Sequence, residues 1–187
     1  MKVTVSDNIK SATSAMKALP GGVNRAVAAT LNRVAEGMKT EAARIIAKTY
    51  NIKNKDVKSL GNVKVTKANT SKLEILLTSK GGNIPLIKFS TNPNAPRRVK
   101  MLKASVKRGG KKPVPGAFVA TMKSGHTGVF ERMGAKRNPI GEKYGPAVPI
   151  MMNNQDVADH LNEQANIRIS KRLDQEMKRV LGGLKMK

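Results

Sequence analysis

The feature that most constrains the fold is a stretch punctuated by proline and glycine, residues 113–152. Pro113, Pro115 and Gly116 at its start interrupt any preceding helix or strand. Proline fixes φ, has no backbone N–H to donate and disfavours helical geometry in the residue before it. An extended segment is therefore expected to begin directly after these residues.

Residues 117–131 have the pattern of a β-hairpin. Residues 117–122 alternate with period two, as side chains on the two faces of a strand do. Ser124 and Gly125 supply the chemistry of a tight turn, and residues 129–131 form the returning strand. One face of the first strand is expected to carry Phe118, Ala120 and Met122.

Two long segments, residues 23–50 and residues 154–182, show the apolar spacing of amphipathic helices. The second helix is expected to start from a cap at Asn153 or Asn154 and to end at the glycine pair 182–183. The apolar stripe of the first helix comprises Val27, Leu31, Val34, Met38, Ala42, Ile45 and Ile46. That of the second comprises Leu161, Ala165, Ile169, Leu173, Met177 and Val180.

The middle of the chain, residues 62–150, is expected to be rich in β-strands. Residues 63–65 and 73–77 alternate apolar with polar positions, and residues 69–71 have the composition of a turn between them. A short helix is expected over residues 54–60, a third strand over residues 84–89 and a loop over residues 90–96. Residues 97–107 alternate imperfectly, with inward candidates Val99, Met101 or Leu102, Ala104 and Val106.

These elements predict an α+β fold with a long N-terminal helix and a C-terminal helix packed on a mainly antiparallel sheet. A meander is the most economical topology for the strands at residues 63–65, 73–77 and 84–89. A chain of 187 residues is of the length of one domain. We therefore expect a single domain over residues 1–187, with residues 1–22 as an N-terminal arm, followed by helix 23–50, the basic middle 62–150 and helix 154–182.

The formal net charge of +24 predicts an acidic or polyanionic partner. The cations are concentrated, because no Asp or Glu occurs from Ile75 through Phe130. Phosphate backbones and acidic protein surfaces both attract such a block, and the sequence does not choose between them. The cations expected to contact the partner are Arg97, Arg98, Lys100, Lys107, Arg108, Lys111 and Lys112.

Residues 108–112, Arg-Gly-Gly-Lys-Lys, form the most basic turn of the chain, called the basic turn below. It lacks the pattern of a nucleotide-binding P-loop, which needs four residues between its glycines and Lys-Ser/Thr after the second. The sequence predicts either a contact with a polyanion or a merely solvated tip.

No pattern in the sequence indicates catalysis or a cofactor. Cysteine is absent, and the two histidines, His126 and His160, do not occur in metal-binding spacings. His126 lies near Ser124 and Glu131, but neighbours on a tight turn rarely converge on one substrate atom, so an exposed turn histidine is expected. No signal peptide and no apolar run long enough to span a membrane is recognised, so we expect a soluble, non-enzymatic protein without cofactor or metal.

Several short motifs occur in an order that resembles one known family. The run Pro-Gly-Ala-Phe at residues 115–118 is followed by Phe-Glu-Arg at 130–132, Asn-Pro-Ile at 138–140 and Tyr-Gly-Pro-Ala-Val-Pro at 144–149. The first helix contains Asn-Arg-Val-Ala at 32–35. The chain resembles the bacteriophage minor tail protein Z family, whose members are called tail completion proteins. The motif residues to which the resemblance gives a packing role are Pro115, Gly116, Phe118, Phe130, Pro139, Tyr144, Pro146 and Pro149.

The resemblance implies a virion structural protein at the head-proximal end of a phage tail, in the neck, where it is needed for head–tail joining. It implies a fold like those of tail completion and terminator proteins, and a homo-oligomeric ring whose subunits meet head to tail. The implied neighbours are tail tube or terminator proteins, head connector proteins and packaged DNA in the channel. Synthesis and assembly are implied in the host cytoplasm.

The alternative is a stand-alone basic protein that binds nucleic acid without sequence preference. Against it, Phe89 is the one aromatic residue of the acid-free block before the hairpin, so base stacking has little support. Helix-turn-helix and zinc-finger spacings are also absent from the sequence. Charge alone keeps this alternative open.

Overall fold

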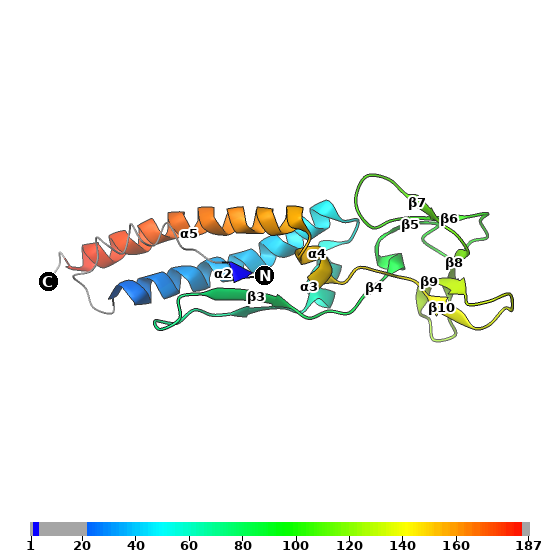
Figure 1. The fold of residues 1–187 in the computed structure, drawn as a ribbon, viewed down its shortest axis with the longest axis horizontal. Coiled ribbons are helices and arrows are strands. Elements are labelled where there is room, and N and C mark those ends of the chain that lie inside the picture. Colours follow the sequence, from blue (N-terminus) through cyan, green and yellow to red (C-terminus); the bar gives the residue numbers. More distant parts are fainter. Residues whose placement is uncertain (1, 4–21, 185–187) are drawn as a thin grey trace. The chain divides into compact units, whose positions relative to one another are not determined.

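The computed structural model describes the backbone of residues 2–3 and 22–184 (Figure 1). The chain folds as two compact units. Unit 1 comprises Met1–Ala42, Val63–Ser79 and Asn153–Lys187, and unit 2 comprises Ala43–Asn62 and Lys80–Met152. The expected N-terminal arm falls outside the described residues except for residues 2, 3 and 22. That the units behave as a single domain stays a prediction.

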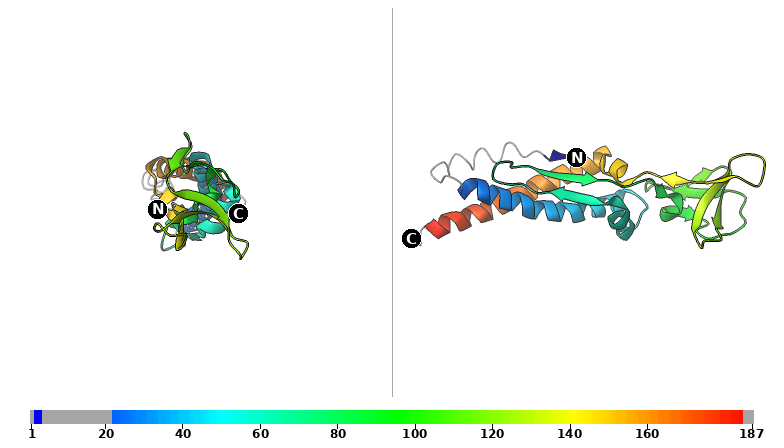
Figure 2. Two further views of the ribbon diagram at one scale, coloured as in Figure 1. Left: turned by 90° about the vertical axis from the view of Figure 1, so that its right-hand side faces the viewer. Right: turned by 90° about the horizontal axis from the view of Figure 1, so that it is seen from below.

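Helix α5 (Gln155–Leu184) and the part of helix α2 (Gly22–Thr49) up to Ala42 form the body of unit 1. The two helices run antiparallel and side by side (Figures 1 and 2). Their apolar stripes are buried as the spacing predicts, with Leu31, Met38, Leu161 and Ile169 each at most 1% exposed. The side chains of Met177 and Val180 lie outside the described part of the structure.

Both ends of α5 differ in detail from the sequence prediction. Asn154 directly precedes the helix and its carbonyl accepts the N–H of Ala158, but its side-chain oxygen is buried without a hydrogen-bond partner among the described residues. The helix also continues through Gly182 and Gly183 to Leu184. Glycine lowers helix propensity by only about 1 kcal/mol and does not forbid helical dihedrals, so the glycine pair was a weak stop signal.

A small antiparallel sheet lies along α2 in unit 1, in the order β1–β3–β2 (Figure 2). Its strands are β1 (Lys2–Val3), β2 (Val63–Thr66) and β3 (Ile75–Ser79). The expected turn is formed by Asn69, whose side-chain oxygen accepts the N–H groups of Ser71 and Lys72 at 3.0 and 2.6 Å. Asn32 on α2 fixes the same segment, since its amide bonds both the N–H and the carbonyl of Ala68 at 2.7 and 2.9 Å.

Unit 2 contains short strands in separate small sheets. Helix α3 (Asn54–Gly61) and the short helix α4 (Val148–Met152) accompany them. The sheets have the orders β5–β6–β7, β10–β9–β8 and β11–β4. The strands are β4 (Ile84–Pro85), β5 (Ser90–Asn92), β6 (Leu102–Ser105), β7 (Lys112–Val114), β8 (Ala117–Thr121), β9 (Thr127–Arg132), β10 (Ile140–Glu142) and β11 (Tyr144–Gly145).

The mixture of helices and antiparallel strands confirms the α+β class, and β8 and β9 confirm the hairpin. Several details of the middle were wrong. The third strand stops at Pro85, where a 3-10 turn over Leu86–Lys88 begins, because proline cannot donate to a ladder. The expected loop at 90–96 contains strand β5. Strand β4 pairs with β11, which lies far away in the sequence, so the expected third strand does not join the β2–β3 pair.

Val99 was wrong as an inward position, because β6 begins only at Leu102, and of the alternatives Met101 and Leu102 it is Leu102 that is buried. Val99 and Met101 are 39% and 48% exposed, whereas Leu102 and Ala104 are buried as expected. In β8 the buried residue is Val119, on the face opposite Phe118 and Ala120.

Replacing Leu161 by alanine tests the packing of α5. Leu161 is fully buried, so Leu161→Ala should lower the free energy of unfolding by about 2–5 kcal/mol, measured by urea denaturation. Ile167→Ala on the same helix is the matched control, because Ile167 is 54% exposed and its loss should cost less than about 0.5 kcal/mol. Equal losses in the two variants would contradict the observed helix face.

Candidate polyanion-binding site

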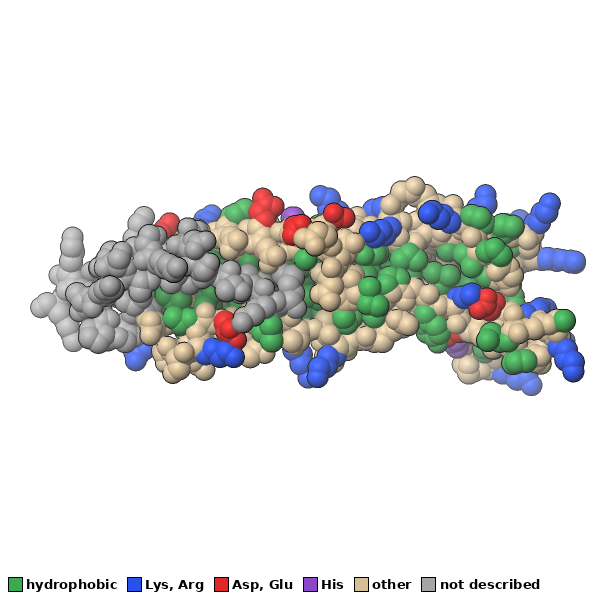
Figure 3. All heavy atoms as spheres, viewed as in Figure 1, with side chains coloured by type: hydrophobic (Ala, Val, Ile, Leu, Met, Phe, Trp, Pro, Cys, Tyr) green, Lys and Arg blue, Asp and Glu red, His purple; other side chains and the backbone are tan. Residues whose placement is uncertain are grey.

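The cations predicted to meet a polyanion are all exposed in unit 2. Arg97, Arg98 and Lys100 lie in the loop between β5 and β6, and Lys107, Arg108, Lys111 and Lys112 lie between β6 and the start of β7. Figure 3 shows lysine and arginine side chains around the margin of the β-rich part, with hydrophobic side chains between them. Exposure permits the predicted contact, and the contact itself stays a prediction.

The root of the basic turn is anchored by the end of α2. The N–H of Arg108 donates to the Thr49 carbonyl at 3.0 Å, and its guanidinium donates to the Ala47 carbonyl at 3.2 Å. The Lys107 ammonium lies 5.9 Å from the centre of the Tyr50 ring. Lys107 and Arg108 therefore have structural contacts of their own, which the charge pattern did not reveal.

The tip of the basic turn depends on glycine. Gly109 and Gly110 have φ angles of +123° and +128°, which side-chain-bearing residues rarely adopt. Beside the tip is a groove of about 500 Å³ whose apolar floor includes Leu86 and Val114 and whose lining includes Arg108 and Lys112. The root of the basic turn is thus hydrogen-bonded to the end of α2, and its tip has backbone dihedral angles that favour glycine.

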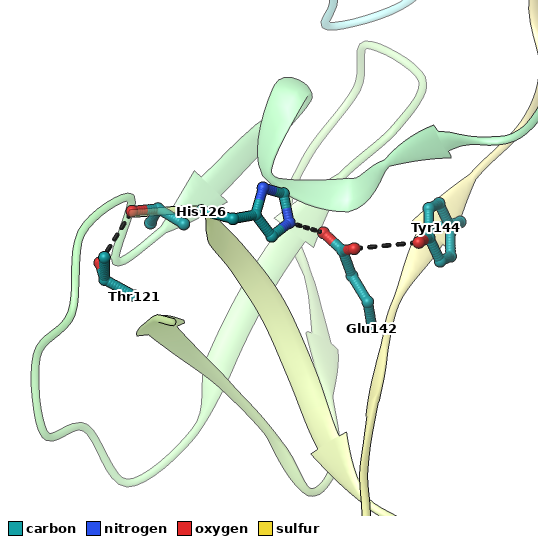
Figure 4. A network of polar contacts seen from close by, with 5 residues as sticks. Thr121, His126, Glu142 and Tyr144 are labelled. Atoms are coloured by element: carbon teal, nitrogen blue, oxygen red, sulfur yellow. Dashed lines mark hydrogen bonds and ion pairs between the residues drawn. The ribbon is translucent and has the colours of Figure 1, made fainter. Parts of the chain in front are cut away.

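A polar network braces the turn of the β8–β9 hairpin (Figure 4). The Glu142 side chain is 14% exposed, and one of its oxygens lies 2.8 Å from Nε2 of His126. Its other oxygen accepts the Tyr144 hydroxyl at 2.9 Å. This hydrogen bond, then the carboxylate charge, then partial desolvation raise the pKa of Tyr144 above its ordinary value.

Glycine at position 128 makes room for this network. A Cβ on Gly128 would lie 2.5 Å from the Glu142 oxygen that meets His126. The histidine was expected to be a plain turn residue near Ser124 and Glu131, but its partner is Glu142, while Glu131 pairs with Lys143 at 2.6 Å. Sixteen residues separate His126 from Glu142, so local spacing gave no signal of the pair.

The motif residues are found in different environments. Phe118 and Phe130 pack with ring centres 6.4 Å apart, and the Arg132 guanidinium lies 5.6 Å from the Phe118 ring centre. Pro146 and Pro149 are partly buried, whereas Pro115, Gly116, Pro139 and Tyr144 are exposed. A packing role for the exposed residues, in contacts with another chain, stays a prediction.

Unit 1 holds a second polar cluster, between α2 and α5. Glu41 on α2 is 6% exposed, and its carboxylate lies 2.7 Å from the Arg168 guanidinium and 3.5 Å from His160. Arg168 passes close to Gly37, where an added Cβ would lie 3.0 Å from it. Both histidines thus bind glutamates that are remote in the sequence.

Two further properties of the described residues bear on other functions. No group of three or more His, Cys, Asp or Glu side chains among them is placed to hold a metal ion. None of the described helices is both long and apolar enough to cross a membrane.

Comparison with known proteins identifies the class. The family model of prophage minor tail protein Z (GPZ) matches residues 8–185, and the chain belongs to this family of phage tail proteins. It is 33% identical over 121 residues to the tail completion protein of Escherichia phage N15. That alignment covers 63% of this chain and 65% of the relative, which is less than two thirds of the relative's length. No solved structure matches.

The Glu142 carboxylate can be tested through Tyr144. Because the carboxylate raises the pKa of Tyr144, Glu142→Gln should lower that pKa toward the ordinary tyrosine value, measured by the absorbance of tyrosinate during an alkaline titration. Tyr144→Phe assigns the transition, since the chain has two tyrosines. Glu131→Gln is the control, and an unchanged Tyr144 pKa in Glu142→Gln would contradict the network.

Proposed function

We propose that this phage tail protein completes the head-proximal end of the tail, in the neck, and is needed for joining the tail to the DNA-filled head. The observation that carries the proposal is the family match over residues 8–185, together with a relative that is itself named a tail completion protein. The role is structural and needs no catalytic group. Synthesis and assembly take place in the host cytoplasm.

The proposed partners follow from charge and from the geometry of a neck. A homo-oligomeric ring with head-to-tail contacts presents the same surface of every subunit to a central channel. The exposed cations of unit 2 then meet packaged DNA or acidic faces of tail tube, terminator and head connector proteins. The net charge of +24 supports either contact, because both partners are anionic.

Disrupting this gene in a phage that carries it tests the role. We expect electron micrographs of the lysates to show full heads and tails accumulating unjoined, because the surface that joins them is missing. A plasmid copy of the gene should restore joined particles and serves as the control. Joined particles at the normal proportion in the disrupted phage would remove the completion role.

DNA binding by the purified protein tests the completion role separately from the phage experiment. The completion role predicts weak, sequence-blind DNA binding, which with about 6–10 phosphate contacts would weaken a thousand- to hundred-thousand-fold between 50 and 200 mM salt. Titration of duplexes of different sequence at both salt concentrations measures this. Sequence-selective binding that survives 200 mM salt would contradict the completion role.

A further inference from the structure

Unit 2 contains a second basic pocket, which charge patterning along the sequence did not reveal. The pocket has a volume of about 800 Å³. It is lined by the start of α3, by residues from Pro85 to Asn94, by Lys111 of the basic turn and by the turn of the β8–β9 hairpin. Segments remote in the sequence therefore meet around one hollow.

The lining is cationic. Lys53, Lys88 and Lys111 line the pocket together with His126. Asp56 is the one acid among the described residues of the lining, and its carboxylate lies 3.7 Å from the Lys88 ammonium. The charge of Asp56 is thus offset inside the pocket, and the remaining lysines leave an excess of positive charge.

Two polar features of the pocket have no partner within the described residues. The N-cap residue of α3, Lys53, has no side-chain acceptor and makes no capping hydrogen bond, so the first N–H groups of the helix have no side-chain cap from it. Thr91 in the lining is 7% exposed, and its hydroxyl oxygen is buried without a hydrogen-bond partner. A buried hydroxyl without a hydrogen-bond partner is costly to the folded state.

His126 is held in place at the rim. Glu142 binds its Nε2 from one side, and the Tyr144 hydroxyl in turn fixes the glutamate (Figure 4). The imidazole therefore belongs to a braced hairpin turn. Neither Glu142 nor Tyr144 is part of the pocket lining, so the carboxylate orients the ring from outside.

We propose that this pocket is a phosphate-binding site that takes a segment of the DNA backbone. The evidence is the convergence of Lys53, Lys111 and His126 around one hollow in which Lys88 pairs the acid Asp56. A volume of about 800 Å³ is much larger than one phosphate ion, so a run of phosphodiester groups fits it better than a free ion. This inference rests on the proposed function, since it supplies the DNA contact that the neck would make.

The test compares two triple variants with the same loss of charge. The pocket variant carries Lys53→Gln, Lys88→Gln and Lys111→Gln. The control variant carries Lys55→Gln, Lys58→Gln and Lys80→Gln, at exposed lysines of unit 2 that do not line the pocket. Each variant lowers the net charge from +24 by three, to +21. Thermal melting checks that both variants are folded.

Binding of a short mixed-sequence duplex is measured at 50 and 200 mM salt. In the pocket variant we expect the affinity at 50 mM to fall about tenfold or more and the salt slope to fall by about one for each phosphate that the protein no longer neutralises. The control variant should change affinity by less than about twofold, since its exposed lysines do not line the pocket and are screened by salt. Equal effects of the two triples, or wild-type affinity in the pocket variant, would overturn the proposal.

Titration with inorganic phosphate distinguishes a site for free phosphate from a site for the DNA backbone. At constant ionic strength, phosphate should shift the His126 ring signals in nuclear magnetic resonance spectra of the wild type and not of the pocket variant. A phosphate response with no pocket-specific loss of DNA affinity would overturn DNA as the ligand. Because these measurements use purified protein, their failure leaves the head–tail joining experiment unaffected, and failure of that experiment leaves the pocket measurable.

Discussion

The antiparallel packing of α2 and α5 is the interaction on which the helical unit depends. Aromatic residues make up 3% of the chain and tryptophan is absent, so burial must come from aliphatic side chains. Leu31, Met38, Leu161 and Ile169 are almost fully buried, and each such side chain contributes about 1.5–3 kcal/mol. The β1–β3–β2 sheet covers the same core with Ile75 and Leu77. The apolar stripes thus bring together segments from both ends of the chain.

The few acidic side chains of this basic chain form ion pairs and hydrogen bonds between segments that are remote in the sequence. The chain has 12 acidic residues against 36 basic ones, and several carboxylates bind cations or histidines between remote segments. Glu41 does so between α2 and α5, and Glu142 between the hairpin turn and β11. The Glu41 carboxylate lies 2.7 Å from the Arg168 guanidinium, and this contact holds the buried carboxylate between the two helices.

The candidate site was only partly visible in the sequence. Charge patterning found the exposed cations of the basic turn and of the loop before β6, because a run of like charges must be solvated or paired. It did not select Lys53, Lys88 or His126 as contacts, although Lys88 lies in the acid-free block, because these residues come from separate segments and meet Lys111 only in the folded unit. It also could not show that the Arg108 guanidinium binds the Ala47 carbonyl.

The sequence by itself determined both long helices, the β2–β3 pair, the β8–β9 hairpin, the α+β class and the family. These depend on local periodicity, on turn residues such as Asn69 and on motif order, all of which are written along the chain. Only the tertiary structure decided that β4 pairs with β11, that His126 meets Glu142 and that a basic pocket forms beside α3. The physical reason is that such contacts join residues far apart in sequence, and no local pattern encodes which partner a short strand or a single charge will find.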